Sequence, residues 1–192
     1  MSNSTNSNCD PQQVPNNLQE QDPTICVICH GEPPTNAVRL GCGHIFCYLC
    51  AKSEAQIRGI CPLCRTEISI GFDTQEHSII GVARLPTSSD GYYWFYEGAR
   101  GWWLFDADTN SDIEDAFVND RKYVEKFIAG SIYSIDLDKM EQRRKDGSGR
   151  ARKLIRSTLK LENIVGMAGI RGEDFEDLLD LMRSASDLPI LG

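Results

Sequence analysis

The sequence lacks the features of a membrane protein or a secreted precursor. None of its apolar runs approaches the roughly 18 residues that a transmembrane helix needs, and no basic segment followed by an apolar stretch opens the chain. Positive charge is also scarce, because 20 Lys and Arg residues face 28 Asp and Glu residues and give a formal net charge of −8. A net negative protein is repelled by the phosphate backbone. We therefore expect neither membrane attachment nor general binding of DNA or RNA.

The length of 192 residues is typical of one or two domains. Residues 1–24 are rich in Asn, Gln, Ser and Pro, which predicts disorder because little apolar surface is available for burial. Thr, Ser, Pro and Gly in residues 73–90 predict a linker, with a short ordered piece at residues 79–82. A cysteine-rich domain at residues 25–72 and an aromatic domain at residues 91–161 remain, and an acidic tail follows at residues 162–192.

Eight cysteines in a chain of this kind require an explanation. Seven of them, with one histidine, follow a regular spacing: Cys26-x2-Cys29, Cys42-x-His44-x2-Cys47-x2-Cys50 and Cys61-x2-Cys64. Zn²⁺ prefers four thiolate or imidazole ligands in a tetrahedron, and two cysteines separated by two residues bind one ion from a tight turn. The spacing therefore predicts two complete zinc sites.

Other uses of these side chains remain as alternatives. A disulfide framework is the usual role of many cysteines in a secreted chain, and a catalytic thiol is a further alternative. His30, next to Cys29, competes with His44 as the imidazole ligand. Cys9 lies outside the pattern, within the segment predicted to be disordered.

The spacing resembles the C3HC4 RING finger of ubiquitin E3 ligases over residues 26–64. The resemblance implies a small cross-brace fold with interleaved ligand pairs: Cys26, Cys29, Cys47 and Cys50 hold one Zn²⁺, and Cys42, His44, Cys61 and Cys64 hold the other. It also implies that the partner is a ubiquitin-loaded E2 enzyme. The RING holds the ubiquitin in an attack-ready pose, with no covalent intermediate on this chain.

The E2-contacting positions of RING fingers match Ile28 and Pro62 in this sequence. Arg65 matches the position from which a cation bridges E2 and ubiquitin, and an ordinary solvated arginine is the alternative interpretation. Gln56 stands near a helical position where many active RING fingers have Trp. This departure leaves the affinity for E2 and the choice of E2 open.

The aromatic domain has the patterns of a β-sheet. Residues 92–96 and 102–105 are aromatic runs separated by a Gly-containing turn, which predicts a hairpin. Residues 123–128 and 131–137 predict a second strand pair, and residues 140–145 and 150–159 predict a third across the Asp-Gly-Ser-Gly turn.

Two helices are predicted around this sheet. Ser111 and Glu114 form a capping box, which predicts a short helix beginning after Ser111. In the tail, four apolar residues share one face of a predicted helix at residues 173–183: Phe175, Leu178, Leu179 and Met182. This face either packs on its own domain or docks on a partner.

Basic residues are concentrated in the aromatic domain. Residues 139–160 contain nine basic and two acidic side chains, whereas residues 161–192 contain two basic and seven acidic ones. Aromatic rings beside guanidinium groups suit a ligand with both rings and phosphates, such as a nucleotide. The alternative is an aromatic core beside a solvated basic face.

The run Trp-Phe-Tyr-Glu-Gly-Ala-Arg-Gly-Trp-Trp at residues 94–103, followed by Glu114, resembles a WWE domain over residues 91–161. The resemblance implies a half-barrel sheet with one packed helix that binds poly(ADP-ribose) through its internal unit, iso-ADP-ribose. The order RING then WWE resembles the Iduna-like RING–WWE ubiquitin ligases over residues 26–171. The expected fold class is therefore α+β.

The ligand contacts of this family match six positions of the chain: Lys52 in the RING, and Tyr96, Trp103, Tyr133, Gln142 and Arg152 in the WWE domain. Trp94 and Trp102 are then expected in the core. The family also has a basic residue just before a Gly-x-Ala-Gly stretch, where this chain has Val165. Either nearby Lys160 substitutes for this residue or the ligand binds more weakly.

The resemblance implies an E3 ligase of the cytosol or nucleus that is allosterically activated by poly(ADP-ribose) and ubiquitinates poly(ADP-ribosyl)ated proteins. One alternative is a non-catalytic poly(ADP-ribose) reader with a zinc interaction module, and another is a nucleic-acid site in the basic stretch. Tails of the family carry Arg-led, Gly-ended motifs for tankyrase. Arg144 and Gly149 have a similar spacing but lie in the predicted sheet, so a tankyrase-like polymerase has no clear motif here.

Overall fold

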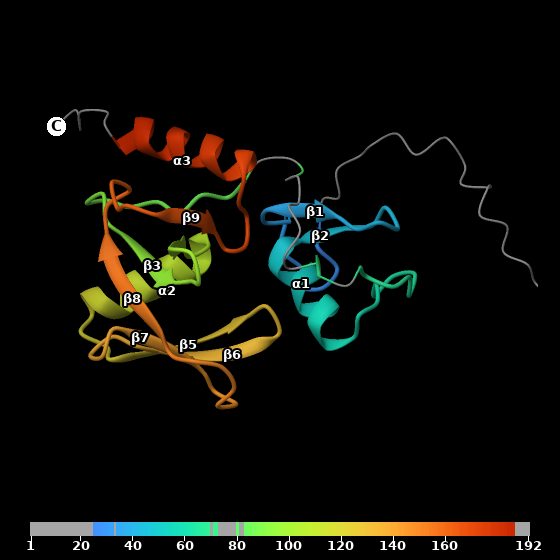
Figure 1. Ribbon diagram of the computed structural model, residues 1–192, viewed down its shortest axis with the longest axis horizontal. Helices are drawn as coiled ribbons and strands as arrows, with labels where there is room; N and C mark the ends of the chain where they lie inside the picture. The colour runs from blue at the N-terminus through green and yellow to red at the C-terminus, as the bar shows by residue number, and fades with distance from the viewer. Residues whose placement is uncertain (1–24, 33, 70, 73–79, 81–82, 187–192) are drawn as a thin grey trace, which may run out of the picture.

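The structure, a computed structural model, describes residues 25–32, 34–69, 71–72, 80 and 83–186. The predicted disorder of residues 1–24, Cys9 and most of the piece predicted at residues 79–82 lie outside this part of the chain. The described residues form a cysteine-rich domain and an aromatic domain that lie side by side (Figure 1). None of the helices within these ranges has the length and apolar character to cross a membrane.

The cysteine-rich domain contains a two-stranded sheet and one helix. β1 (Ala37–Arg39) pairs antiparallel with β2 (Ile45–Cys47), and α1 (Tyr48–Ile57) follows β2 directly. Val38, Phe46 and Ala51 are fully buried in its core. A core of this size stabilises little by itself, so a domain of this kind depends on bound metal for much of its folding free energy.

The aromatic domain is a curved seven-stranded sheet with the order β5-β6-β7-β8-β3-β4-β9. Its strands are β3 (Tyr93–Glu97), β4 (Trp102–Leu104), β5 (Tyr123–Ile128), β6 (Ser131–Asp136), β7 (Glu141–Arg144), β8 (Arg152–Ser157) and β9 (Ile164–Met167). The three predicted hairpins are confirmed, because β3–β4, β5–β6 and β7–β8 pair antiparallel. β9 was not predicted; it pairs parallel with β4 and carries the sheet past residue 161.

Helices cover both faces of this sheet. Successive side chains along β3 point to opposite faces, so the strand packs against both helices. Trp94 points to the face covered by α2 (Ala107–Val118), where it packs with Ile113. Tyr93 and Phe95 point to the opposite face, which α3 (Glu173–Ser186) covers (Figure 1). The predicted α+β class and the half-barrel sheet with its packed helix are confirmed, and α3 adds a second helix.

The predicted start of α2 is wrong. The N-cap is Asp106 and not Ser111, and the Asp106 carboxylate accepts a hydrogen bond from the Thr109 backbone N–H at 3.0 Å. Asp caps a helix as well as Ser does. Asp106 is buried, so its carboxylate is held beside the free N–H groups, whereas Ser111 lies inside the helix and is exposed.

The predicted apolar face of α3 is covered by its own domain. Phe175, Leu179 and Met182 are buried in the core that Tyr93 and Phe95 share, and Leu178 packs against it. Arg183 reinforces the contact by donating two hydrogen bonds to the Leu159 carbonyl, at 3.1 and 3.2 Å. The interpretation that this face docks on a partner is therefore wrong.

The two domains meet where turns of the aromatic domain lie against α1. The α carbons of Gly130 and Gly169 approach α1 closely: a methyl group at Gly130 would lie 3.2 Å from Ser53 Oγ, and one at Gly169 would lie 2.1 Å from the Tyr48 ring. Leu49 of α1 packs against the cores of both domains. The turns and α1 therefore share one interface.

Candidate functional site

The structure gathers the eight predicted ligands into two groups. Cys26, Cys29, Cys47 and Cys50 form one group, and Cys42, His44, Cys61 and Cys64 form the other. Within each group, the candidate ligand atoms all lie within 4.8 Å of one another. This interleaved pairing is the arrangement that the RING resemblance implies.

The separations within these groups fit tetrahedral zinc. Bond lengths of about 2.3 Å to sulfur and about 2.0–2.1 Å to nitrogen require an S···S edge of about 3.8 Å and an S···N edge of about 3.6 Å. Cys29 Sγ lies 3.7 Å from Cys47 Sγ, and His44 Nδ1 lies 3.5 Å from Cys42 Sγ and 3.6 Å from Cys61 Sγ. The residues present therefore fit two Zn²⁺ ions.

Two turns of the same design hold the first and last cysteine pairs. His30 N–H donates to the Cys26 carbonyl at 2.7 Å, and Arg65 N–H donates to the Cys61 carbonyl at 2.8 Å. His30 and Arg65 both adopt left-handed backbone conformations, with φ of 58° and 62°. His30 is exposed and belongs to neither ligand group, so the alternative assignment of His30 as a ligand is not supported.

The thiols of the first group form hydrogen bonds with one another, and these bonds shift their pKa values in opposite directions. Hydrogen bonds from Cys47 and Cys50 lower the pKa of Cys26 far below that of a free thiol. The bond with Cys26 in turn raises the pKa of Cys47 to about 12. A cation that accepts all four thiolates removes this competition, which is the chemistry of a structural zinc site.

The residues that match E2 contacts lie on the two cysteine turns. Ile28 and Pro62 are half-buried, and their neighbours Val27 and Leu63 are 48% and 54% exposed. Arg65, directly after the last ligand, is exposed. Each turn therefore presents apolar side chains beside one of the two groups of candidate metal ligands.

A pocket lies between α1 and the aromatic domain, and it has two connected parts. The inner cavity has a volume of about 140 Å³ and the outer cavity about 470 Å³. The residues that line both cavities are Lys52, Tyr96, Tyr133, Arg144, Arg152 and Gly169. Gln142 lines the inner cavity and Trp103 the outer one, so the pocket brings together all six predicted ligand residues.

Aromatic rings and guanidinium groups face each other in this pocket. Tyr96 and Trp103 are cross-strand partners, with ring centroids 6.4 Å apart and planes at 16°. The Arg152 guanidinium lies 5.6 Å from the centre of the Tyr96 ring. Arg144 donates from Nε to the Tyr133 hydroxyl at 3.0 Å. Burial raises the pKa of Tyr96, so its hydroxyl stays protonated and available as a donor.

Gln142 has an unsatisfied hydrogen-bond acceptor, its side-chain oxygen Oε1, inside the pocket. Its side chain is 3% exposed, and Oε1 has no hydrogen-bond partner among the described residues. A buried carbonyl oxygen without a donor is costly, and such atoms are rare in folded proteins. The orphaned Oε1 in the inner cavity therefore points to a ligand that donates a hydrogen bond.

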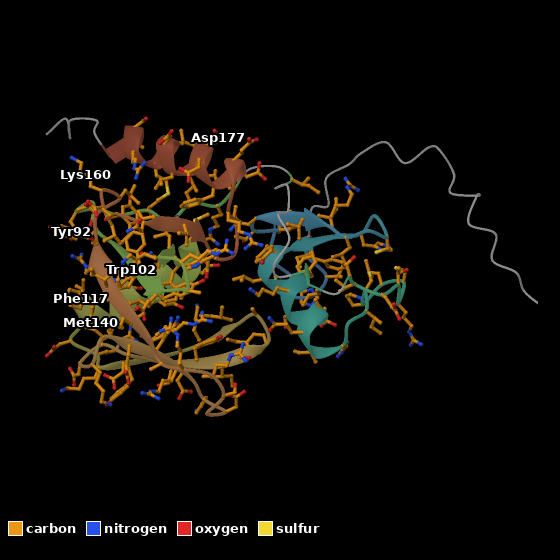
Figure 2. The ribbon with its side chains drawn as sticks, in the orientation of Figure 1. Tyr92, Trp102, Phe117, Met140, Lys160 and Asp177 are labelled. Atoms are coloured by element: carbon orange, nitrogen blue, oxygen red, sulfur yellow. The ribbon has the colours of Figure 1, made fainter. Side chains whose placement is uncertain are left out.

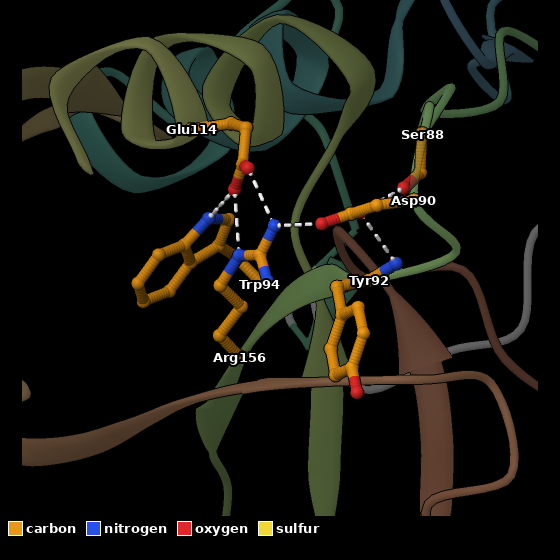
Figure 3. Close-up of polar contacts among 6 residues, drawn as sticks. All are labelled: Ser88, Asp90, Tyr92, Trp94, Glu114 and Arg156. Carbon is orange, nitrogen blue, oxygen red and sulfur yellow. Dashed lines mark hydrogen bonds and ion pairs between the residues drawn. The ribbon is translucent and has the colours of Figure 1, made fainter. Parts of the chain in front are cut away.

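A second polar cluster lies away from the pocket and joins β3, β8 and α2. Glu114 of α2 accepts from Trp94 Nε1 at 2.7 Å and from Arg156 at 2.6 and 3.0 Å (Figure 3). Arg156 also donates to Asp90 at 2.6 Å. These hydrogen bonds are satisfied within the domain, so this cluster, which includes the first Trp and the Glu of the WWE motif, has a structural role.

Comparison with known families agrees with this geometry. The C3HC4-type zinc finger (RING finger) family matches residues 22–70, and the WWE domain family matches residues 92–156. This chain is a RING–WWE protein. The cysteine-rich domain is its RING, and the aromatic domain is its WWE domain.

Curated relatives are similar to this chain over most of its length. The E3 ubiquitin-protein ligase rnf146 of Xenopus tropicalis is 37% identical over 178 residues, which cover 91% of this chain and 55% of the relative. RNF146 of Homo sapiens is 37% identical over 164 residues, which cover 84% of this chain and 45% of the relative. The RING–WWE protein thus spans about half the length of these relatives.

The structure corrects one assignment and adds pocket residues. Lys160, the suggested substitute for a basic residue at position 165, does not line the pocket and lies at the side of the WWE domain away from the RING (Figure 2). Arg144, Arg150 and Arg171 line the pocket and were not predicted. Arg144 follows Gln142 by two residues, so strand alternation would have placed both on one face. No local signal pointed to Arg171.

Proposed function

We propose that this RING–WWE protein is a RING-type E3 ubiquitin ligase that binds iso-ADP-ribose in the interdomain pocket and is activated by it. The observation that carries the proposal is that one pocket is lined by both domains, with Lys52 from the RING helix and Arg152 from the WWE sheet. The E3 names of the relatives support the ligase activity, and the WWE match supports poly(ADP-ribose) as ligand.

The pocket chemistry suits a ligand with a base, riboses and phosphates. Tyr96 and Trp103 offer aromatic surface for the adenine, while Arg152 and Lys52 offer positive charge to phosphates. Gln142 Oε1 would accept a hydrogen bond from a ribose hydroxyl or the adenine amino group, and Tyr133 would form a further one. Binding would thus satisfy a buried atom that the free protein leaves unpaired.

The catalytic part of the proposal concerns the RING. Ile28 and Pro62 would contact a ubiquitin-loaded E2, and Arg65 would bridge E2 and ubiquitin. Zn²⁺ in the two sites would hold the turns that carry these residues, without taking part in ubiquitin transfer. Because the RING positions the E2-bound ubiquitin, the attacking amine takes ubiquitin directly from the E2 and none is bonded to this chain.

α1 provides a physical route from the ligand to the E2 surface. Lys52 lines the pocket, and Cys47 and Cys50 at the start of the same helix belong to the metal group of Cys26 and Cys29. Ile28 lies between Cys26 and Cys29. A ligand bound to Lys52 and Arg152 would fix α1 against the WWE domain and favour one RING arrangement. Activation then follows if the ligand binds the E2-competent arrangement more tightly.

The implied substrates are poly(ADP-ribosyl)ated proteins, which the WWE domain would recruit in a reducing compartment, the cytosol or the nucleus. The test is ubiquitin-chain synthesis by the zinc-loaded full chain and an E2, with and without iso-ADP-ribose. We expect the ligand to increase the rate, and Arg152→Ala to abolish both ligand binding and the increase while two zinc ions remain bound. Equal rates with and without ligand would exclude activation. Ligand binding with no E2 discharge would identify a non-catalytic reader.

A further inference from the structure

A second groove lies between the RING and the WWE domain, and none of the six predicted ligand residues lines it. Its volume is about 390 Å³. Its lining includes Ile28, Leu49 and Cys50 of the RING and Asp108, Lys126 and Phe127 of the WWE domain. This junction groove therefore joins Ile28, the RING residue that would contact E2, to a surface of the WWE domain.

Phe127 of β5 is an exposed aromatic residue at the edge of the junction groove. It is 64% exposed, whereas Tyr48, which also lines the groove, is 2% exposed. Val124 and Ile128 pack against the WWE core, and side chains alternate along a strand, so Phe127 points away from that core. Its cross-strand partner Ile132 is 47% exposed. The pair forms an apolar patch, and such patches mark sites where proteins dock.

The turn between β5 and β6 holds this patch beside the RING (Figure 1). Gly130 in the turn lies against α1, because a methyl group there would be 3.2 Å from both Ser53 Oγ and Ile57 Cδ1. Ile57 is itself 59% exposed. Exposed apolar side chains therefore lie on both sides of the domain boundary, on α1 and on the β5–β6 hairpin.

The apolar turns of the RING offer little surface to an E2 by themselves. They present four side chains, those of Val27, Ile28, Pro62 and Leu63. A stable protein–protein interface uses about 20–30 residues of each partner. An E2 bound to Ile28 therefore has to cover neighbouring surface as well, and the junction groove begins at Ile28 itself.

We propose that the β5–β6 hairpin of the WWE domain is part of the E2-docking surface, and that Phe127 contacts the E2 beside Ile28. This inference rests on the proposed function, because it takes Ile28 as an E2 contact. Aromatic side chains that become buried at the centre of an interface contribute much of its binding energy. The E2 then binds both domains at once, so its affinity depends on how the WWE domain is placed against the RING.

Calorimetry with the zinc-loaded full chain, saturated with iso-ADP-ribose, tests the inference. The probe is a free E2, chosen as the one that the unaltered protein discharges fastest. Phe127→Ala should weaken E2 binding roughly tenfold. In discharge assays it should raise the KM for the ubiquitin-loaded E2 by a similar factor and leave kcat unchanged, because Phe127 would contact none of the reacting groups.

Tyr123→Ala is the matched control. Tyr123 is 57% exposed on the same face of β5, about 13 Å from Phe127 along the strand. It does not line the junction groove, so its loss should leave E2 affinity unchanged. Equal zinc content, urea midpoints and iso-ADP-ribose affinity of the two variants exclude a folding defect or a change in the ligand pocket. If Phe127→Ala is less stable, Phe127→Thr keeps a residue that suits a strand and should weaken E2 binding in the same way.

The outcomes separate this inference from the proposed function. If the unaltered protein binds the E2 and Phe127→Ala binds it within twofold of Tyr123→Ala, the hairpin assignment alone is wrong. It is also wrong if only the ubiquitin-loaded E2 binds more weakly, because ubiquitin would then contact the hairpin. A chain that self-associates through Phe127, with unchanged E2 affinity in Phe127→Ala, would make the patch a contact between copies and would overturn the assignment. If the unaltered protein binds and discharges no E2, the proposed function fails and this inference fails with it.

Discussion

Glu114 and Trp94 are joined by a hydrogen bond of 2.7 Å between the Glu114 carboxylate and the indole Nε1. Trp94 is fully buried, so its N–H would be unsatisfied without this partner. The same carboxylate binds Arg156 (Figure 3). The Arg156 guanidinium also lies 5.2 Å from the centre of the Phe117 ring. One acidic side chain therefore connects α2 to two strands of the WWE sheet.

Replacing this acid should destabilise the WWE domain. Glu114→Gln keeps an acceptor for Trp94 but removes the charge that holds Arg156, whose side chain is 18% exposed. We expect the free energy of unfolding to fall by about 1–2 kcal/mol. Urea denaturation followed by tryptophan fluorescence measures this, because all three Trp residues lie in the WWE domain. Asp138→Asn, in the exposed pair with Lys122, is the control and should change little. Equal effects of the two substitutions would contradict the structural role of Glu114.

The Asp90–Arg156 pair makes WWE stability depend on pH. Hydrogen bonding to Arg156, with further help from the Tyr92 N–H, lowers the pKa of Asp90 to about 2, while an unfolded chain titrates near 3.9. A lowered folded pKa means that the stabilisation is fully present above about pH 4 and is lost as the pH falls toward 2. At pH 6, the Asp90→Asn variant should therefore have a lower urea midpoint of unfolding than the unaltered protein. The difference between the two midpoints should be smaller at pH 2.5. A constant difference across this range would contradict the assignment.

We expect Gln142 to lower the stability of the free protein and to contribute to the binding of iso-ADP-ribose. Gln142→Met has a similar shape and removes the orphaned buried oxygen, so the free energy of unfolding should rise by about 1 kcal/mol. Affinity for iso-ADP-ribose should fall at the same time. Asn110→Leu is the matched control, because the buried Asn110 amide donates to the Trp94 carbonyl at 3.3 Å and its loss should lower stability. A less stable Gln142→Met variant would show that Gln142 is a structural residue.

Contact between the domains should depend on the small size of Gly169. Gly169→Ala would place a methyl group 2.1 Å from the Tyr48 ring, in addition to strain at a φ of 100°. Gly147→Ala has the strain alone, because φ is 76° and no atom lies within 4 Å of the new methyl group. We expect Gly169→Ala to be less stable than Gly147→Ala by at least about 1 kcal/mol. It should also reduce the activation by iso-ADP-ribose. Equal behaviour of the two variants in thermal unfolding and ubiquitin-chain assays would mean that α1 does not rest on this turn.

Arg65 should affect ubiquitin transfer and leave ligand binding unchanged. Arg65→Ala removes the exposed cation next to the last zinc ligand, and we expect ubiquitin discharge from the E2 to slow roughly tenfold. Arg58→Ala is the control, since Arg58 is an exposed arginine of the same domain, paired with Glu54 at 3.6 Å. If ubiquitin discharge is as fast with Arg65→Ala as with Arg58→Ala, Arg65 is an ordinary solvated arginine. Calorimetry should give the same iso-ADP-ribose affinity for both variants.

Local patterns predicted local structure well and long-range packing poorly. The hairpins follow from short turns between β-forming runs, so their partners are neighbours in sequence and the predictions are confirmed. The N-cap of α2 was misplaced because Asp106 and Ser111 are both acceptable caps, and burial of Asp106 decided between them. β9 carries little strand signal of its own and depends on parallel pairing with β4, far away in the sequence.

The sequence by itself determined the eight candidate metal ligands and the order of the domains. A thiolate pair two residues apart binds one ion from its own turn, so spacing is sufficient to predict such a site. Only the tertiary structure decided which other residues join the six predicted ones in the pocket. Its lining comes from α1, from the six strands β3 to β8 and from the turn after β9, so its charges meet through strand pairing and domain contact. Arg171 is the clearest example: the turn at Gly169, packed against Tyr48, returns it to the pocket, and no pattern around residue 171 indicates that position.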